Sequence, residues 1–253
     1  MNLTIDIGNT LQKIAVFNND ECVYCQSFPS ITEAILLSVF NQFPIKYSIV
    51  SSVAGLDAQV IALLDTKTKM IYYTHQTKAP ITILYKSVET LGLDRIANAV
   101  GAAAMYPAKN ILSIQAGTCL VLDFVNAHGA YLGGSISPGM QMRFEALHEK
   151  TKNLPLLENI QKISFTTKCT KNAQRSQEFL GTDTQSSLSS GVINGICHEI
   201  DGFIEDYRVK FENLTVLLTG GDANYLQKSI KNTIFAAPNV VLKGLNEIIK
   251  YNV

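Results

Sequence analysis

The sequence contains no tryptophan, only four histidines, and no excess of charge of either sign. Its 21 Lys and Arg residues equal its 21 Asp and Glu residues, so it lacks the net positive field that attracts nucleic acid or an anionic membrane. No apolar run approaches the roughly 18 residues of a membrane-spanning helix. The first residues include Asp6 and lack a basic start followed by an apolar core, which excludes a secretory signal pattern. We therefore expect a cytoplasmic protein without nucleic-acid or membrane partners.

Cysteine is also scarce, and the odd count of five argues against a disulfide framework. Cys22 and Cys25 form a C-x-x-C pattern, but the segment ECVYCQSF has the composition of a strand. Residues three apart in a strand face opposite sides of the sheet, and neither a second pair nor a nearby histidine completes a metal site. We expect reduced thiols and no metal centre built on cysteine or histidine.

The remaining composition is that of a globular protein, with 47% hydrophobic and 17% charged residues over 253 positions. The chain opens with three strand-like segments, LTIDIG, LQKIAVFN and ECVYCQSF, separated at GNT and NND. Helical and strand-like segments then alternate, and the same order of three strands, helix, strand, helix, strand and helix begins again at NILSIQAG. The repeat predicts an internally duplicated α/β chain with halves at residues 1–108 and 109–253.

Each half has a glycine turn between its first two strands. In DIGNT the glycine lets backbone N–H groups converge on an anion, while Asn9 and Thr10 add side-chain donors and Lys13 follows in the next strand. Asp6 cannot bind a phosphate, but its carboxylate can hold a magnesium ion or its waters beside one. These residues suit a polyphosphate cradle, although a plain β-hairpin would use the same turn chemistry.

The second half contains two further glycine turns. QAGT occupies the point equivalent to DIGNT, so that Gln115 stands where the first half has Asp6. LLTGGDANY has Gly220 and Gly221 between a strand and a helix, where a nucleotide could approach the backbone. An ordinary strand-to-helix loop is the alternative, but a second hairpin turn equivalent to the first strengthens the phosphate interpretation of both.

The segment LGLDRIANAVGA begins a helix with Asp94 and Arg95 in its first turn. Asp94 could simply cap that helix. As chemistry, its carboxylate could accept the proton of a hydroxyl that attacks phosphorus. Arg95 beside it could hold a substrate carboxylate through a two-pronged hydrogen bond.

Six motifs follow one another in the order found in one known family. They are DIGNT with Lys13, GLDR, AGT with Asp123, GGSISPGM, GTDTQSSLSSG and LTGGD. Over its whole length the chain resembles the type III pantothenate kinases, of the superfamily of actin-like ATPases, sugar kinases and heat-shock chaperones. The resemblance implies duplicated ribonuclease-H-like (actin-like ATPase) domains with an ATP cleft between them. It also implies ATP-dependent phosphorylation of pantothenate to 4'-phosphopantothenate, the first step of coenzyme A biosynthesis.

The resemblance implies roles for individual residues. The aspartate of the GLDR motif, Asp94, would be the catalytic proton acceptor. The residues expected to bind ATP are Asp6, Ile7, Gly8, Asn9, Thr10, Leu11, Gln12, Lys13 and Thr118. The residues expected to line the pantothenate site are Tyr85, Gly92, Leu93, Asp94, Arg95 and Thr184. The family often has a proline three residues after the tyrosine, where this sequence has Val88.

Cofactors and oligomeric state are implied in the same way. Magnesium would lie at Asp6, and family members need a monovalent cation, K⁺ or NH₄⁺, tied to an aspartate that is Gln115 here. Glutamine keeps a carbonyl oxygen but no charge, so we expect a monovalent cation to bind there more weakly. Family members are homodimers, and a candidate contact is the close-packing face that carries Gly191 and Gly195 on the long helix expected over 188–207.

Two other functions stay open at this point. The protein could be a kinase of another small hydroxy acid, because a fold does not determine a substrate. It could also be a non-catalytic regulator, since some relatives are described as accessory regulators of gene expression and the lost ion ligand suits a degenerate copy. The residues whose retention argues for an active enzyme are Asp6, Lys13, Asp94, Arg95 and Thr118.

Overall fold

The computed structural model of the chain describes residues 1–8, 11–51, 56–157 and 179–253. They form a mixed α/β protein with two sheets, which divides into two compact units. The first unit comprises Met1–Ser113, Asp123–Gly134 and Ala237–Val253, and the second comprises Ile114–Leu122 and Ser135–Ala236. Within the described ranges, no helix combines the length and the apolar character needed to cross a membrane.

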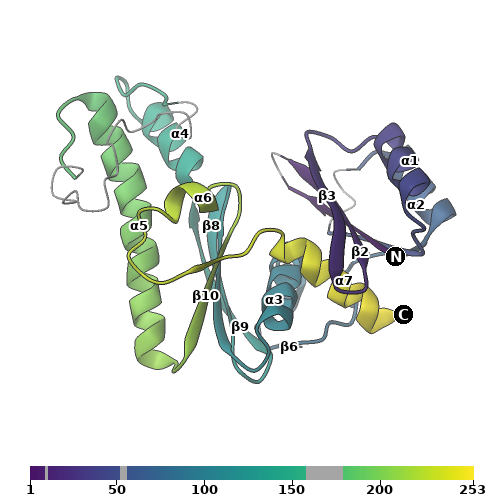
Figure 1. Cartoon of the computed structure of the whole chain (residues 1–253). Helices are drawn as coiled ribbons and strands as arrows, with labels where there is room; N and C mark the ends of the chain where they lie inside the picture. Colours follow the sequence, from purple (N-terminus) through teal and green to yellow (C-terminus); the bar gives the residue numbers. More distant parts are fainter. Residues whose placement is uncertain (9–10, 52–55, 158–178) are drawn as a thin grey trace. The chain divides into compact units, whose positions relative to one another are not determined.

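The first sheet has the strand order β3-β2-β1-β4-β5, and Figure 1 shows β2 and β3 side by side in it. Its strands are β1 (Asn2–Ile7), β2 (Gln12–Asn18), β3 (Glu21–Phe28), β4 (Tyr47–Val50) and β5 (Lys69–Ile71). The first three form an antiparallel meander, and β4 and β5 run parallel to β1. The strand predicted at MIYYTH is shorter than expected, because pairing with β4 stops at Ile71.

Helices α1 (Glu33–Gln42) and α2 (Ala58–Lys67) are amphipathic and pack with the first sheet. In α1 the buried positions are Leu36 and Val39, and in α2 they are Val60 and Leu64, so each helix buries a single stripe. These side chains share a core with β1 and β2, while the side chain of Thr32 and that of Asp57 cap the two N-termini.

Helices α3 (Leu93–Met105) and α7 (Val240–Asn252) pack against each other in the first unit, although about 150 residues separate them in the chain. A Cβ atom on Gly244 would lie 1.7 Å from the carbonyl oxygen of Ala97, and one on Gly101 would lie 2.2 Å from that of Val240. Only glycine permits this approach of backbone to backbone, which explains two residues that an isolated helix would disfavour by about 1 kcal/mol each.

The second sheet has the order β11-β10-β7-β8-β9-β6. Its strands are β6 (Thr82–Ile83), β7 (Asn110–Ala116), β8 (Cys119–Val125), β9 (Ala130–Pro138), β10 (Leu214–Thr219) and β11 (Phe235–Ala236), and a 3₁₀ turn covers Val88–Thr90. Read from β9 to β11, the strands of the second half stand in the order β9-β8-β7-β10-β11, and β6 is added at the edge beside β9. The first sheet has the same order of third, second, first, fourth and fifth strand of its half. The predicted duplication of strand order is therefore confirmed.

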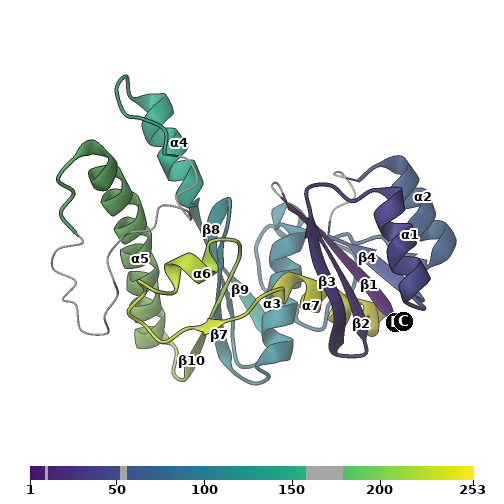
Figure 2. The same ribbon diagram turned by 45° about the horizontal axis from the view of Figure 1, so that its top comes forward.

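The helices of the second unit are α4 (Met140–Lys150), α5 (Thr184–Lys210) and α6 (Ala223–Leu226). The helix α5 begins earlier than the predicted residue 188, because Asp183 and Ser186 form a capping box at its N-terminus. Arg143 of α4 donates to Glu199 of α5 at 2.5 Å, and Figure 2 shows the two helices side by side. A Cβ on Gly191 or Gly195 would meet no described atom within 4 Å, so the close packing expected at these two glycines is not made among the described residues of one copy, and their role as a dimer contact stays a prediction.

The two cysteines of the C-x-x-C pattern lie on one face of the edge strand β3, not on opposite faces as predicted. Cys22 lies opposite Phe17 of β2 and Cys25 lies opposite Ala15, two residues that share a face. The register shifts between Val16 and Phe17, so that one extra residue of β3 forms a β-bulge and reverses the alternation.

Candidate active site

The turn between β1 and β2 joins two strands that place Asp6 directly opposite Lys13. The backbone N–H of Gly8 donates to the carbonyl oxygen of Leu11 at 3.2 Å, and a Cβ on Gly8 would lie 2.9 Å from that oxygen. The tight turn therefore requires glycine. The predicted donors Asn9 and Thr10 lie outside the described residues.

Asp6 is held by a short network that sequence reasoning missed. The Ser51 hydroxyl donates to Asp6 Oδ1 at 3.0 Å, and the Ile7 N–H donates to Ser51 Oγ at 2.9 Å. Burial raises the pKa of Asp6, and the negative charge of Asp94 also raises it, against the opposing effects of Ser51 and Lys13. The carboxylates of Asp6 and Asp94 thus lie within electrostatic reach of each other, and a cation beside Asp6 would stabilise its charged form.

The other predicted nucleotide-binding residues of this turn face different surroundings. Ile7 is half-buried at the end of β1, whereas Leu11 is exposed. The side-chain carbonyl of Gln12 accepts the Ile31 N–H at 2.6 Å and so ties the turn to the segment before α1. Because the Gln12 side chain is engaged in this structural hydrogen bond, a nucleotide contact at Gln12 would be made by its backbone.

The helix α3 starts at the GLDR motif and separates its two charged residues. Gly92 is the N-cap, Leu93 is half-buried and Asp94 is exposed, while Arg95 is buried with 7% of its surface accessible. A Cβ on Gly92 would lie 2.5 Å from Asp94 Oδ1. The absence of a side chain at Gly92 therefore leaves room for the Asp94 carboxylate.

Arg95 belongs to a cluster that includes the predicted substrate residue Tyr85. The guanidinium carbon of Arg95 lies 5.9 Å from the centre of the Tyr85 ring. On its other side Arg95 forms an ion pair with Asp123 at 2.6 Å, and Tyr131 also donates to Asp123. No function was assigned to Asp123 or Tyr131 from the sequence. The signal that could have pointed to Asp123 is its charge within the otherwise apolar strand CLVLDFV.

The second unit brings three of the glycine motifs together at the end of β7. Gly139 of the SPG segment donates to the carbonyl oxygen of Thr118 at 3.1 Å, and Asp222 of the GGD segment donates to that of Ala116 at 3.0 Å. Gly220 has a positive φ of 101°, and its Cβ would lie 2.2 Å from the Ala116 oxygen. A Cβ on Gly117 would meet no described atom within 4 Å, so the QAGT turn leaves its backbone open to a ligand.

Gln115 and Thr118 occupy this same turn region. Thr118 is exposed, as a residue that contacts a ligand should be. Gln115 is half-buried, and its Nε2 is a buried donor without a hydrogen-bond partner among the described residues. An unpartnered buried donor is costly, and it is the opposite of the acceptor that a cation needs.

Thr184 is exposed in the first turn of α5, next to a cavity of about 990 Å³ in the second unit. This cavity is lined mainly by apolar residues of α4 and α5, among them Met142, Leu147 and Leu188, with Arg143 at its edge. The structure therefore places Thr184 in the second unit, whereas Tyr85, Gly92 and Arg95 belong to the first.

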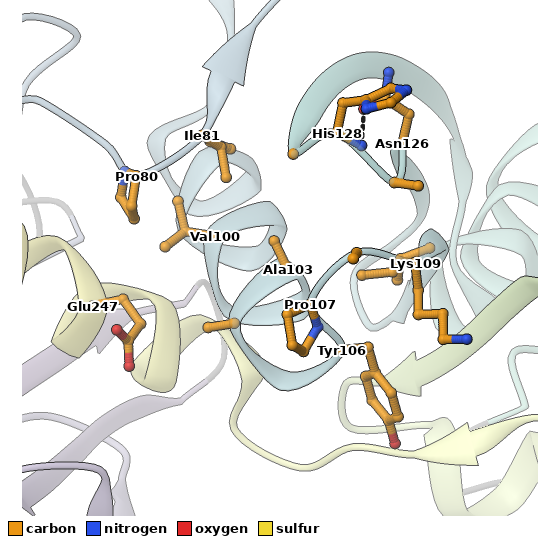
Figure 3. A pocket seen from close by; sticks show the side chains of 15 residues that line it. Pro80, Ile81, Val100, Ala103, Tyr106, Pro107, Lys109, Asn126, His128 and Glu247 are labelled. Carbon is orange, nitrogen blue, oxygen red and sulfur yellow. Dashed lines mark hydrogen bonds between the residues drawn. The ribbon is translucent and has the colours of Figure 1, made fainter.

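A second cavity, of about 380 Å³, lies at the opposite end of α3 (Figure 3). Pro80, Ile81 and Val100 line it, and the charged end of Lys109 points away from them. At 1.5 Å per residue, Tyr106 on its wall is about 18 Å along the helix from Asp94. The cavity is therefore not part of the candidate active site.

Comparison with known proteins identifies the family. A family model described as type III pantothenate kinase matches residues 2–206. A type III pantothenate kinase of Flavobacterium psychrophilum is 40% identical over 256 aligned residues, which cover 99% of each chain. The chain belongs to the type III pantothenate kinase family. Another member, from Bacteroides fragilis, is 38% identical over 100% of this chain and 98% of its own. The family resemblance predicted from the motifs is confirmed.

Solved structures agree with this family in fold. A Baf family transcriptional activator from Campylobacter jejuni gives a TM-score of 0.53 at 19% identity, over 99% of this chain and 98% of that one. An activator of 2-hydroxyisocaproyl-CoA dehydratase from Clostridium difficile, with bound ADPNP, gives a TM-score of 0.53 at 15% identity, over 99% of this chain and 95% of that one. A glucokinase from an Antarctic psychrotroph gives a TM-score of 0.51 at 12% identity, over 99% of this chain and 98% of that one. At such identities the likeness concerns the fold alone, and it confirms the predicted actin-like ATPase and sugar-kinase architecture.

Proposed function

We propose that the protein transfers the γ-phosphoryl group of ATP to the primary hydroxyl of pantothenate, forming 4'-phosphopantothenate in the cytoplasm as a homodimer. The observation that carries this proposal is family membership along the whole chain, with the aspartate of the GLDR motif kept as Asp94. The proposed repeat boundary lies near residue 108. The proposed ATP contacts come from residues 6–13 and Thr118, and the proposed pantothenate contacts from Tyr85, the GLDR segment and Thr184.

Asp94 is suited to act on the hydroxyl. It is exposed in the first turn of α3, where its carboxylate can orient the attacking hydroxyl and accept its proton. Lys13, opposite Asp6, supplies positive charge beside the β1–β2 turn. Positioning and charge neutralisation account for most of the catalysis in phosphoryl transfer, so these residues need no covalent step.

The donor set of the first unit fits a magnesium ion. Magnesium would supply neutralisation of the phosphate charge, and it is usually held by one or two carboxylates together with phosphate oxygens and water. Asp6 would hold it, because burial and the neighbouring Asp94 leave its charge in need of a cation. Within the described ranges, no group of three or more acidic, histidine or cysteine side chains is placed to hold a metal ion.

The first experiment is pantothenate-dependent ADP release by the purified protein, titrated with potassium, ammonium and sodium. Turnover that needs pantothenate supports the proposal. Turnover only with another hydroxy acid would reassign the substrate within the same fold. Failure with a panel of hydroxy acids at every ion concentration would contradict the kinase function and favour a regulator.

Replacing Gln115 by aspartate should lower the concentration of potassium or ammonium needed for half-maximal turnover by about fivefold to tenfold. A carboxylate about 4 Å from a monovalent cation adds about 1 kcal/mol of attraction even in a highly screened setting. The native Gln115 offers no charge, and its buried Nε2 is a donor. The same titration as above measures the effect, with sodium as the control ion. Unchanged half-saturation by both ions would show that no cation lies at position 115.

Replacing Gly92 by alanine should lower kcat by roughly tenfold to a hundredfold, because the new methyl group would lie 2.5 Å from Asp94 Oδ1 and would displace the carboxylate. A displacement of about 1 Å in a reacting group can cost a factor of that size. Steady-state kinetics measures the change, with the melting temperature as a check on folding. Native kcat in Gly92→Ala would mean that the observed Asp94 position is not the reactive one.

A further inference from the structure

Asp123 lies in the interior of the first unit, with no surface exposed to solvent. Its Oδ1 accepts three hydrogen bonds, from Arg95 Nε at 3.0 Å, Arg95 Nη2 at 2.6 Å and the Tyr131 hydroxyl at 2.7 Å. Tyr131 is itself fully buried and packs 6.0 Å from the ring of Tyr85. The Tyr85 ring and one carboxylate oxygen of Asp123 thus contact the guanidinium of Arg95, and Tyr131 contacts both Asp123 and Tyr85.

This arrangement is poor as a device for stability alone. Asp123 Oδ2 is buried without a hydrogen-bond partner among the described residues, and burial raises the pKa of the Asp123 carboxyl against the pull of Arg95. A buried ion pair often contributes little net stability, and an unsatisfied carboxylate oxygen lowers it further. Local costs of this kind are concentrated at functional sites.

Arg95 retains donors for a ligand after binding Asp123. A guanidinium has five N–H groups, and the Asp123 contact uses the Nε–H and one Nη2–H. The other three N–H groups lie along the Nη1 and Nη2 edge, which has the geometry for two parallel hydrogen bonds to a carboxylate. Tyr85 is a further hydrogen-bond partner of the Arg95 side chain, so this tyrosine and the ligand would share that edge. The Asp123 contact fixes the direction of that edge, and Tyr85 lies over the plane of the group.

We infer that Asp123, supported by Tyr131, is a positioning residue that orients Arg95 toward the carboxylate of the acid to be phosphorylated. The inference rests on the proposed function and deepens it, because it assigns the recognition of an acidic substrate to a buried ion pair. Asp123 does not touch the substrate. Its loss should therefore weaken the recognition of the carboxylate and leave the transfer of the phosphoryl group itself largely unchanged.

The test compares pantothenate with its neutral primary amide in the native protein and in Asp123→Asn. Asparagine keeps the shape but removes the charge that holds Arg95. We expect the ratio of kcat/KM for acid over amide to fall about tenfold to a hundredfold, through KM for the acid and with kcat changed by less than threefold. If Asp123→Asn does not fold, Tyr131→Phe, which deletes one hydroxyl, should lower the ratio by about threefold. An unchanged ratio in a folded variant overturns the inference.

Two controls separate positioning from general damage. Asn98 lies on the same helix as Arg95 and donates a buried hydrogen bond to the Ser113 hydroxyl at 2.8 Å. Ser113→Ala removes that hydrogen bond and should leave the ratio of kcat/KM for acid over amide unchanged. In an Arg95→Gln background, Asp123→Asn should have no further effect on the ratio, because its only route to the substrate is gone. A fall in the ratio with Ser113→Ala, or a further fall in that background, contradicts the inference.

Calorimetric binding of both compounds distinguishes this inference from the proposed function. Native turnover with an unchanged ratio in Asp123→Asn overturns the positioning role alone. Selective binding of the acid without turnover, lost in Asp123→Asn, overturns the kinase function and supports the positioning role. Neither turnover nor binding in the native protein overturns both.

Discussion

Replacing Asp94 by asparagine should lower kcat by about 10²- to 10⁴-fold, the usual range for loss of a general base. Asparagine has nearly the same shape, but it can neither accept the proton of the attacking hydroxyl nor repel Asp6. The side chain is exposed in the first turn of α3, so the free energy of unfolding should change by no more than about 0.5 kcal/mol. The expected variant is therefore folded, able to bind its substrates, and nearly inactive.

Single-turnover kinetics with saturating ATP and pantothenate measures this effect, and calorimetry checks that pantothenate still binds. Asp206→Asn is a matched control, because Asp206 is an exposed aspartate on α5, outside the candidate active site, and its kcat should stay within twofold of native. An Asp94→Asn variant that kept kcat within threefold of native would exclude Asp94 as the proton acceptor.

Replacing Gly244 by alanine should destabilise the protein by about 2–3 kcal/mol, near the upper end of the usual range for overpacking. The added methyl group would lie 1.7 Å from the carbonyl oxygen of Ala97 and 2.8 Å from the N of Gly101, both backbone atoms. No side-chain rotation can relieve such a contact, so α3 and α7 would have to separate. The intrinsic preference of alanine for helix offsets about 1 kcal/mol of a still larger cost.

Thermal unfolding measures the loss, which for a chain of this size corresponds to a fall of roughly 5–10 °C in Tm. Gly202→Ala in α5 is the matched control, since its Cβ would meet no described atom within 4 Å. That variant should be equally stable or up to about 1 kcal/mol more stable, as expected for glycine replaced in an exposed helix. Equal melting temperatures for Gly244→Ala and the native protein would contradict the close backbone contact of α3 and α7.

The sequence predicted features that depend on neighbours along the chain. The glycine turns at Gly8 and Gly117, the start of α3 near Gly92 and the order of the strands follow from local conformational preference and periodicity. The duplicated architecture could be predicted for the same reason, because one pattern of short-range signals occurs twice. The roles of individual site residues toward ATP and pantothenate stay predictions.

Contacts between distant segments could not be predicted in this way. Asp6 and Ser51 are 45 residues apart, and Arg95 and Asp123 are 28 residues apart, so no periodic pattern connects them. The face of Cys22 was wrongly assigned because a bulge depends on how β3 pairs with β2, and strand alternation alone does not reveal it. Side-chain partners at the site are tertiary information, and even a correct motif leaves them undefined.

The packing of α7 has a consequence for the order of events during protein synthesis. Asn2 of β1 donates to Asn246 of α7 at 2.8 Å, and Asn246 donates in turn to the carbonyl oxygen of Asn19. The packing of the first unit thus depends on α7, a helix that is synthesised more than 130 residues after Asp94 and Arg95. A nascent chain emerges N-terminus first, and domains made in one continuous stretch can fold as they appear. The packing surface between α3 and α7 is therefore incomplete until α7 has been synthesised and has emerged, and the helix that carries Asp94 acquires its native packing only then.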